Sequence, residues 1–513
     1  MSSNKNLFFV FLFILAIFTR FIKLNWGDNF FFNPDENNMA NSVLQMSKHN
    51  LDPKFYAYGQ FPLYLTFLTT PKHDSNNIIL TLRVWSAFFS CLSLYIFYLI
   101  GLKIFKLKKY SSIFVLLLIF TPGLIQLSHF GTTESILLFV FAANILLSFK
   151  IYDSQKIKYL ILASVISGIG FATKLSSLIL ITPIFLSLLF LFINKHNLWQ
   201  LLQRLTIFVF LTILVGIIFS PYNLINFTEF RSSMKYEIGV ATGQIPIFYT
   251  RQFIGSIPYL FQLQKIFPYA NGLPIFIFGL IGFCLILKSY IINLKSNIYL
   301  LLTLFPTLVF FIYQGQLFTK WTRFISPIFF IFPLFSVFLI KKIKSKILLY
   351  SLIFISILPG IYFMKIYFSP DIRVLASEWI NNNISQNSKI LSEGGNVVDI
   401  PIQGQYDVIN FDFYSFDDDI NNQNTINKSI DQSDFIFIPS RRVFKNQNNA
   451  NFPYSQNYYQ NLFSGQINFK LIKTFFNNNS LFLNSENAEE TWSVFDNPVI
   501  RIFSKTNNLD EFI

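Results

Sequence analysis

Long apolar stretches, separated by short polar segments, occupy the first 366 residues of the chain. A helix that crosses a membrane needs about 20 largely apolar residues. About eleven such stretches are present by this criterion, and they cover residues 7–24, 78–100, 111–127, 135–150, 159–173, 178–193, 205–225, 272–288, 298–315, 324–340 and 346–366. The pattern predicts an α-helical polytopic membrane domain over residues 1–366, with about eleven transmembrane helices.

The distribution of Lys and Arg predicts how these helices are oriented. Basic residues are denser in alternate connections, which lie near 103–109, 150–158, 195–204, 288–295 and 341–346. The positive-inside rule places such connections in the cytoplasm, so we expect a cytoplasmic N-terminus. An odd number of helices then leaves the C-terminal part outside a plasma (inner) membrane.

The chain after residue 366 has a different character. Residues 367–513 are polar, rich in Asn and mixed in pattern. Helical spacing is found over 374–380, and short β-type patterns cover 434–439, 492–495 and 499–503. We therefore expect a small extracytoplasmic α/β domain. Two segments before it, 25–77 and 226–271, are long outside loops whose aromatic residues indicate ordered structure.

The composition narrows the class of protein. Apolar residues make up 53% of the chain and charged residues only 13%, which excludes a disordered chain or an ordinary soluble enzyme. Two isolated Cys and four His argue against a disulfide scaffold or a zinc site. The net charge of +14 is better explained by cytoplasmic loops facing anionic lipid than by nucleic acid, which we do not expect as a partner.

The first outside loop contains two adjacent carboxylates in the sequence Asn33-Pro34-Asp35-Glu36. Asn33 is a suitable N-cap, Pro34 suits the first helical position, and Glu36 completes a capping box. Capping accounts for Glu36 but leaves Asp35 unexplained. Asp35 is either a further helix-start residue or a carboxylate held ionised by the helix N-terminus, able to take a proton from a hydroxyl group.

Further ionisable residues lie at the predicted outer ends of the helices. His129 and Glu134 share a short loop, where helix capping by Glu134 is the structural alternative to a functional role. Basic residues at the same membrane face are Arg83, Lys174, Arg251, Lys320 and Arg323. Each one alone is explained by contact with lipid headgroups. Together they suit a phosphate group, although an ion pathway would also use such residues.

Several segments resemble the family 39 membrane glycosyltransferases, which are relatives of protein O-mannosyltransferases and lipid A aminoarabinose transferases and have the GT-C fold. Residues 33–36 resemble the family's Asp-Glu motif. The segment from His129 to Ser135 resembles its second-loop motif, with Glu134 where Asp is common. Similar segments are 58–65, 82–87, 170–174, 249–259, 320–327, with Phe324 in place of Tyr, 371–380, 433–435 and 490–498.

The resemblance implies an inverting transfer of a sugar from a polyprenyl phosphate to a hydroxyl group of a lipid, glycan or protein at the outer membrane face. It implies Asp35 as general base, with Glu36 and Glu134 as further catalytic carboxylates. The donor phosphate and the substrate would then contact Arg83, Lys174, Arg251, Lys320, Arg323, His129 and Tyr58. We expect no cofactor; a divalent metal is not favoured, although Asp35 and Glu134 are suitable ligands. The alternative is a transporter or lipid-glycan flippase without catalysis.

Overall fold

The computed structural model of the chain describes residues 3–292, 297–393, 399–477 and 481–506. The chain divides into two compact units. The membrane unit comprises the residues up to 24 together with 34–241 and 258–364. The C-terminal unit comprises 25–33, 242–257 and the residues from 365 onward. Parts of both long predicted loops thus belong to the C-terminal unit.

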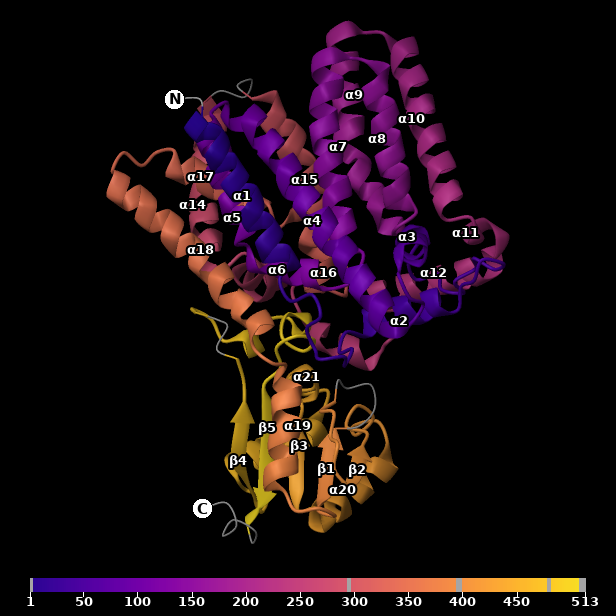
Figure 1. Cartoon of the computed structure of the whole chain (residues 1–513), viewed down its shortest axis with the longest axis vertical. Helices are drawn as coiled ribbons and strands as arrows, with labels where there is room; N and C mark the ends of the chain where they lie inside the picture. Colours follow the sequence, from indigo (N-terminus) through magenta and orange to yellow (C-terminus); the bar gives the residue numbers. More distant parts are fainter. Residues whose placement is uncertain (1–2, 293–296, 394–398, 478–480, 507–513) are drawn as a thin grey trace. The chain divides into compact units, whose positions relative to one another are not determined.

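The membrane unit is built from helices (Figure 1). Its α-helices are α1 (Ser3–Phe21), α2 (Pro34–Leu44), α3 (Phe61–Thr69), α4 (Ser75–Phe105), α5 (Lys108–Ile119), α6 (Pro122–His129), α7 (Glu134–Ser154), α8 (Ile157–Phe171), α9 (Thr182–Lys195), α10 (Leu198–Phe219), α11 (Tyr222–Ile225), α12 (Phe227–Thr242), α13 (Phe267–Ala270), α14 (Leu273–Ile292), α15 (Ile298–Gln316), α16 (Thr322–Ile325), α17 (Ile331–Ile340) and α18 (Lys346–Phe368). The unit also contains two short 3-10 helices, η1 (Leu175–Ile181) and η4 (Ser326–Ile328), and a short π-helix, η3 (Gln262–Ile266).

All eleven predicted apolar stretches coincide with helices of this unit. By length and composition, 6 helices of the described residues can cross a membrane, or 9 if each bent pair is one span. The bent pairs are α5 with α6, α13 and its preceding turn with α14, and α16 with α17. Two further apolar helices, over 10–21 and 157–171, are shorter. The helical membrane architecture is confirmed, and the count of eleven spans stays a prediction.

The bend of 57° between α5 and α6 has a visible cause. Pro122 starts α6 and cannot continue the hydrogen-bond ladder of α5. Arg20 of α1, which is fully buried, donates to the carbonyl oxygens of Leu118 at 3.0 Å and Ile119 at 2.8 Å. The guanidinium thus binds two carbonyl groups at the end of α5, where Pro122 has no N–H group to donate to Leu118.

Glycine residues allow close contacts between helices. α14 packs against α17 along Gly279 and Gly282. A Cβ atom at Gly282 would lie 1.9 Å from the carbonyl oxygen of Phe335, and one at Gly279 would lie 2.8 Å from the Phe332 ring. Small residues at such positions let helix backbones approach closely in a membrane protein.

The C-terminal unit contains a mixed five-stranded sheet in the order β2-β1-β3-β5-β4. β1 pairs in parallel with β2 and β3, and β5 pairs antiparallel with β3 and β4. The strands are β1 (Lys389–Glu393), β2 (Asp407–Phe411), β3 (Phe435–Ile438), β4 (Phe469–Phe475) and β5 (Ile500–Lys505). Its α-helices are α19 (Ile372–Asn383), α20 (Ile420–Gln432), α21 (Arg442–Asn446) and α22 (Pro453–Ser464), and its short turns are η2 (Phe248–Phe253), η5 (Ser485–Asn487) and η6 (Glu490–Trp492).

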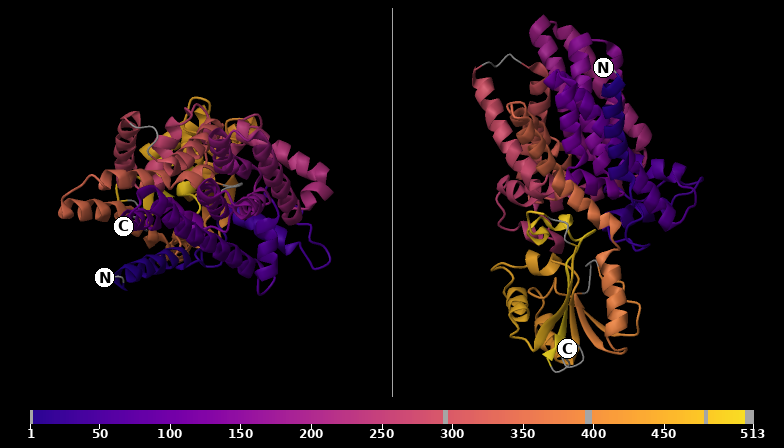
Figure 2. Two further views of the ribbon diagram at one scale, coloured as in Figure 1. Left: turned by 90° about the horizontal axis from the view of Figure 1, so that it is seen from above. Right: turned by 60° about the vertical axis from the view of Figure 1, so that its left-hand side comes forward.

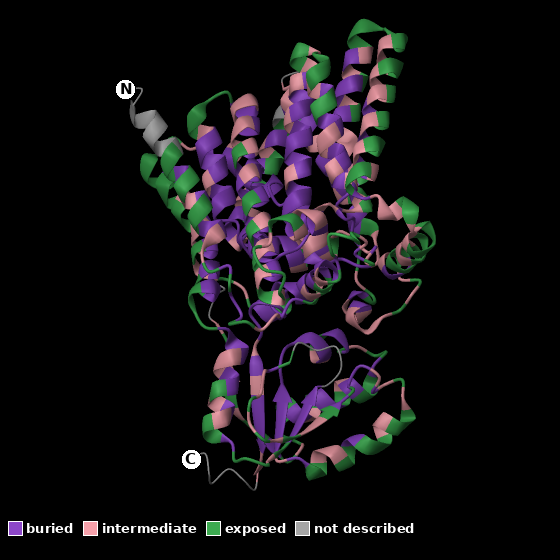
Figure 3. Ribbon diagram, turned by 45° about the vertical axis from the view of Figure 1, so that its right-hand side comes forward, coloured by how far each residue is buried: buried purple, intermediate pink, exposed green. Residues whose placement is uncertain are grey.

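Helices cover both faces of this sheet (Figure 2, right). On one face, Phe435 and Phe437 pack with Ala376 and Ile380 of α19. On the other face, residues of β3 pack with α20 and α22 in a second apolar cluster. Buried residues follow the central strands in Figure 3. The predicted small α/β domain is therefore confirmed, including its helix over 374–380 and its strands over 434–439 and 499–503.

The predicted strand over 492–495 is wrong. This segment forms the end of η6 and a turn, although Trp492, Val494 and Phe495 are all buried. The carbonyl oxygens of Val494 and Phe495 accept hydrogen bonds from the buried guanidinium of Arg373, at 3.2 and 2.6 Å. A side chain thus satisfies backbone groups that a neighbouring strand would otherwise bind.

We expect Gly282→Ala to destabilise the membrane unit by about 1–3 kcal/mol, because the added methyl group would meet backbone rather than a side chain that can move. Thermal unfolding of the purified protein in detergent measures the effect. Leu280→Ala, at an exposed position on the same helix, is the control. Equal stability of the Gly282→Ala variant and the wild type would contradict the close contact between α14 and α17.

The C-terminal unit should become less stable as the pH rises. Burial raises the pKa of Glu393 to about 8 and that of Asp399 to about 6. The folded unit therefore retains protons that carboxyl groups of an unfolded chain, with an ordinary pKa of about 4, have released. The stabilisation that these two groups contribute is fully present below about pH 4 and is lost as the pH rises to about 8.

Glu393→Gln should remove most of this decline above about pH 6, where Asp399 has already ionised. Thermal unfolding of the full chain across the pH range measures it. Glu378→Gln, an exposed carboxylate on α19, should leave the profile unchanged. Parallel profiles for the wild type and Glu393→Gln would contradict the assignment.

Candidate active site

The two carboxylates at the start of α2 have different surroundings. Helix α2 begins at Pro34, with Asp35 and Glu36 in its first turn. Adjacent residues of a helix point about 100° apart, so they face different environments. Glu36 is fully buried, whereas the side chain of Asp35 remains 18% exposed.

Glu36 is bound on both carboxylate oxygens. Arg83 of α4 donates from Nε to Oε1 at 3.0 Å and from Nη2 to Oε2 at 2.7 Å. The backbone N–H of Gly131 donates to Oε1 at 2.5 Å. Arg83 also donates to the carbonyl oxygen of Leu24 at 2.9 Å and is 1% exposed. The pair joins α2 to α4 and to the loop before α7, and the structure places Arg83 against Glu36 rather than at an open surface.

Asp35 binds two side chains that are distant in sequence. The hydroxyl group of Tyr58 donates to Oδ1 at 3.0 Å, and Arg323 of α16 forms an ion pair with Oδ2. Arg323 also lies against the rings of Trp321 and Phe324, at 5.9 and 5.4 Å from their centroids. The carboxylate of Asp35 is therefore held in a fixed direction while part of it stays accessible.

Lys174 connects the Asp35–Tyr58 pair to a second carboxylate, that of Glu134. Its Nζ atom lies 3.6 Å from Oε1 of Glu134, 5.1 Å from the ring centroid of Tyr58 and 4.6 Å from that of Phe324. Glu134 is the first residue of α7 and is 2% exposed. Its Oε2 atom is buried with no hydrogen-bond partner among the described residues.

A backbone contact brings Tyr58 next to Lys174. The N–H of Gly59 donates to the carbonyl oxygen of Thr173 at 2.9 Å, and the N–H of Phe61 donates to that of Ala172 at 3.0 Å. A Cβ atom at Gly59 would lie 2.1 Å from the Ala172 carbonyl oxygen. Only glycine permits this approach, which docks the first long loop on the turn after α8.

Arg323, Asp35, Tyr58, Lys174 and Glu134 thus form one continuous group, which we call the charge cluster. Two carboxylates alternate with two cations in it, and Tyr58 bridges the halves. In such a group the partly accessible carboxylate can take a proton, and the two cations can stabilise a phosphate group in the same place.

Three other predicted residues lie outside these contacts. His129 is buried, with its ring nitrogens 2.8 and 2.9 Å from the carbonyl oxygens of Ile125 and Ile22. Arg251 belongs to the C-terminal unit, where it binds Asp418 at 2.5 Å. Lys320 precedes α16 and donates to the Phe318 carbonyl oxygen at 2.9 Å; burial lowers its pKa to about 8.

The carboxylates of the cluster do not fit a divalent metal well. Asp35 is already paired with Arg323, and Glu134 with Lys174. The negative charges that would bind a metal ion are therefore already neutralised by side-chain cations. Among the described residues, no group of three or more His, Cys, Asp or Glu residues comes together.

Sequence reasoning assigned no role to two residues that shape the cluster. Phe324 provides a ring for both Lys174 and Arg323. Gly59 makes the docking contact described above. Both are adjacent to residues of interest in the sequence, but their contacts join segments more than a hundred residues apart, which a single sequence does not reveal.

Comparison with known proteins identifies part of the membrane unit. Residues 75–225, from α4 to α11, match the family described as dolichyl-phosphate-mannose-protein mannosyltransferase. Over this segment the chain is similar to that family. The relationship to GT-C membrane glycosyltransferases that the motifs indicate is confirmed there, and with the apolar helices it indicates a membrane glycosyltransferase.

Similar solved structures have low sequence identity. ArnT from Cupriavidus metallidurans bound to undecaprenyl phosphate is 12% identical, with a TM-score of 0.45 over 74% of this chain and 73% of that chain. The Archaeoglobus fulgidus oligosaccharyltransferase in complex with Zn and sulfate is 13% identical, with a TM-score of 0.49 over 88% and 71%. Among curated proteins, none matches the chain.

We expect Glu36→Gln to destabilise the protein by about 3–5 kcal/mol, because it leaves the buried Arg83 guanidinium without its counter-charge. The double variant Glu36→Gln, Arg83→Met should lose less than the sum of the two single changes. In a Cys284→Ser background, labelling of the buried Cys91 on α4 by a thiol-reactive dye during heating reports unfolding.

If the losses of stability from Glu36→Gln and Arg83→Met were additive in the double variant, this would contradict a stabilising pair between the two residues. Asp28→Gln, at an exposed position, is the matched control for removing a carboxylate near the start of α2.

Proposed function

We propose that the chain transfers a sugar from a polyprenyl-phosphate donor to a hydroxyl acceptor on the extracytoplasmic side of the membrane, with inversion, and that Asp35 is the general base. The observation that carries this proposal is the pairing of partly exposed Asp35 with Arg323 and Tyr58, beside Lys174. The description of the matched family names dolichyl-phosphate-mannose as the donor, and this compound is a sugar on a polyprenyl phosphate.

Asp35 suits the role of base better than its neighbour. Glu36 has both oxygens bound inside the protein and no exposed surface. Asp35 keeps accessible surface, and the hydroxyl group of Tyr58 holds its direction through Oδ1. A general base must reach the proton that it removes and hold its orientation while doing so.

The transfer is then a single displacement. The acceptor oxygen forms a bond to the anomeric carbon as its proton passes to Asp35. The bond from that carbon to the phosphate oxygen breaks, and its electron pair stays on the polyprenyl phosphate. Attack from the face opposite to the leaving group inverts the configuration.

The cations of the cluster support the leaving group. Arg323 and Lys174 lie on either side of the Asp35–Tyr58 pair, within reach of a phosphate that binds there. Positive charge placed where negative charge develops stabilises the transition state. Glu134 positions Lys174 in this arrangement. No metal is needed for these steps, because the two cations supply the charge.

Contacts at the opposite end of the membrane unit support the proposed orientation. The ends of α4, α7 and α9 and the start of α15 meet there through direct contacts: Lys103 binds Asp153 at 2.7 Å, Lys195 binds Gln155 at 2.5 Å, and Tyr299 binds Asp153 at 2.7 Å. These are the basic connections that the positive-inside rule assigns to the cytoplasm. The charge cluster would therefore face outward, where a lipid, glycan or protein hydroxyl group is the acceptor.

Asp35→Asn should abolish sugar transfer, because the amide keeps the shape of the carboxylate but cannot take up a proton. The measurement is release of polyprenyl phosphate from synthetic polyprenyl-phosphate sugars by purified protein in detergent. Asp28→Asn, the same change at an exposed position, should keep wild-type turnover. General-base loss is expected to lower kcat by about 10²–10⁴-fold.

Lys174→Met separates the two roles of the cluster, since it removes a cation but leaves Asp35 in place. Its turnover should fall while the pH profile of the remaining activity stays that of the wild type. Wild-type turnover by Asp35→Asn would contradict the proposal that Asp35 is the general base. Movement of the donor across a vesicle membrane without loss of its sugar would favour a flippase instead.

A further inference from the structure

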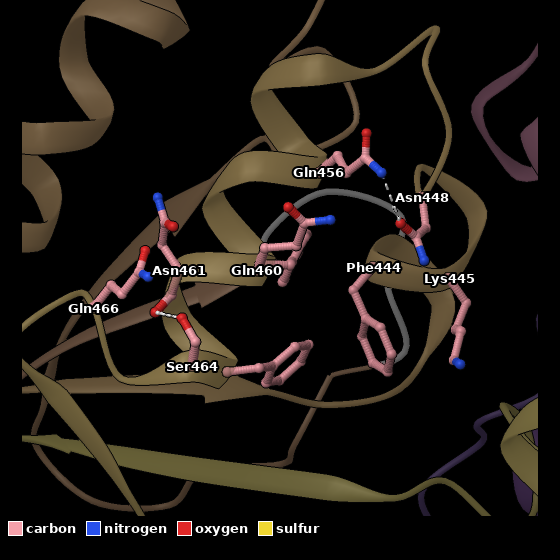
Figure 4. Close-up of a pocket in the computed structure, with 10 residues that line it drawn as sticks. Phe444, Lys445, Asn448, Gln456, Gln460, Asn461, Ser464 and Gln466 are labelled. Atoms are coloured by element: carbon pink, nitrogen blue, oxygen red, sulfur yellow. Dashed lines mark hydrogen bonds between the residues drawn. The ribbon is translucent and has the colours of Figure 1, made fainter.

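A cavity of about 650 Å³ lies in the C-terminal unit between α21 and α22, in the size range of ligand-binding pockets. Its lining comes from a single stretch of chain, residues 444–466. Figure 4 shows Phe444 and Lys445 on one side, Asn461 and Gln466 on the other, and Gln460 between them. Nothing in the proposed transfer reaction uses these residues.

Aromatic rings form one part of the lining. Phe463 is 43% exposed, so part of its side chain is accessible to a ligand. Its ring lies 5.2 Å from that of Phe444 and 6.1 Å from that of Tyr459, with the latter pair stacked at 26°. Arg501 packs against Phe444 and Phe463 and is itself bound to Glu486, so the rings are held in place.

Neutral amides form most of the rest. The lining contains Asn448, Asn461, Gln456, Gln460 and Gln466. An amide side chain both donates and accepts hydrogen bonds, as a sugar hydroxyl group does. Gln456 already donates to Asn448 at 3.4 Å, and the hydroxyl group of Ser464 donates to the Asn461 carbonyl oxygen at 3.3 Å. These contacts orient polar groups around the rim.

The charges of the cavity indicate a neutral occupant. Among the described residues that line it, Lys445 is the one charged residue, and none is a carboxylate. Helix α22 itself contains no charged residue. A nucleotide or an anionic lipid would need a cluster of cations, and a basic peptide would need acids. A pyranose ring instead presents an apolar face of C–H groups to an aromatic ring and hydroxyl groups to amides.

We propose that this cavity binds a neutral carbohydrate, with one sugar ring against Phe463 and Phe444 and its hydroxyl groups bonded to the amides of α22. The site is separate from the charge cluster and does not rest on the proposed transfer reaction. It gives the C-terminal unit a role of its own as a module that holds a glycan.

The test is binding of neutral oligosaccharides of mannose, glucose and N-acetylglucosamine to the full chain. The protein is placed in lipid nanodiscs, because detergents with sugar headgroups would compete for the site. Titration calorimetry gives the affinity, and saturation-transfer NMR identifies the sugar protons in contact. We expect at least one oligosaccharide to bind, and Phe463→Ala to weaken it about tenfold.

Two further variants keep the result interpretable. Gln460→Ala, which removes an exposed amide without touching the apolar core, should weaken binding about fivefold. Tyr454→Ala removes another exposed aromatic residue of α22 that does not line the cavity, and should bind as the wild type does.

Asp35→Asn should also bind the oligosaccharide as the wild type does, because the charge cluster is not involved. The proposal is overturned if no oligosaccharide binds, or if Phe463→Ala and Gln460→Ala bind as tightly as the wild type. It is also overturned if affinity is lost in Asp35→Asn alone, or if uncharged peptides bind at the cavity and the sugars do not.

Discussion

The buried ion pair between Glu36 and Arg83 is the constraint on which the arrangement of the site depends. It fixes the first turn of α2 against α4 and, through Gly131, against the loop that precedes Glu134. The Glu36 carboxylate is bound on both oxygens and has no exposed surface, so a substrate cannot reach it. Its sequence neighbour Asp35 is then left on the accessible side of the same helical turn, and the pair serves the site by what it fixes rather than by reacting.

Close backbone contact is the second feature that recurs in the membrane unit. Gly59, Gly131 and Gly282 each lie where a side chain would meet another segment. The first two of these contacts place Tyr58 and Glu36 within reach of partners from later parts of the chain. Arg20 acts in the opposite way, since it fills a gap in the backbone ladder between α5 and α6. The geometry of the charge cluster thus rests on main-chain packing as much as on side-chain contacts.

The apolar pattern was sufficient to place every predicted membrane segment on a helix, since length and composition decide such segments locally. The sequence also singled out Asp35, because capping could not explain it. It could not show that Arg83 binds Glu36, because that pair joins residues 47 positions apart. Nor could it show that Arg251 belongs to the other unit. The strand expected at 492–495 was wrong because alternating buried residues also occur in a turn whose carbonyl groups a side chain satisfies.

The balance of charges in the cluster has a consequence for the order of events. Arg323 and Lys174 neutralise Asp35 and Glu134, so an arriving phosphate finds no spare positive charge among these four side chains. A phosphate that draws Arg323 away releases the carboxylate that this guanidinium holds. In the proposed reaction the donor would thereby free Asp35 to act as the base, and an acceptor that arrives first would meet a carboxylate still paired with Arg323. The ion pair between Asp35 and Arg323 would thus make proton removal depend on the bound donor, so that it begins only once a sugar is present to receive the attack.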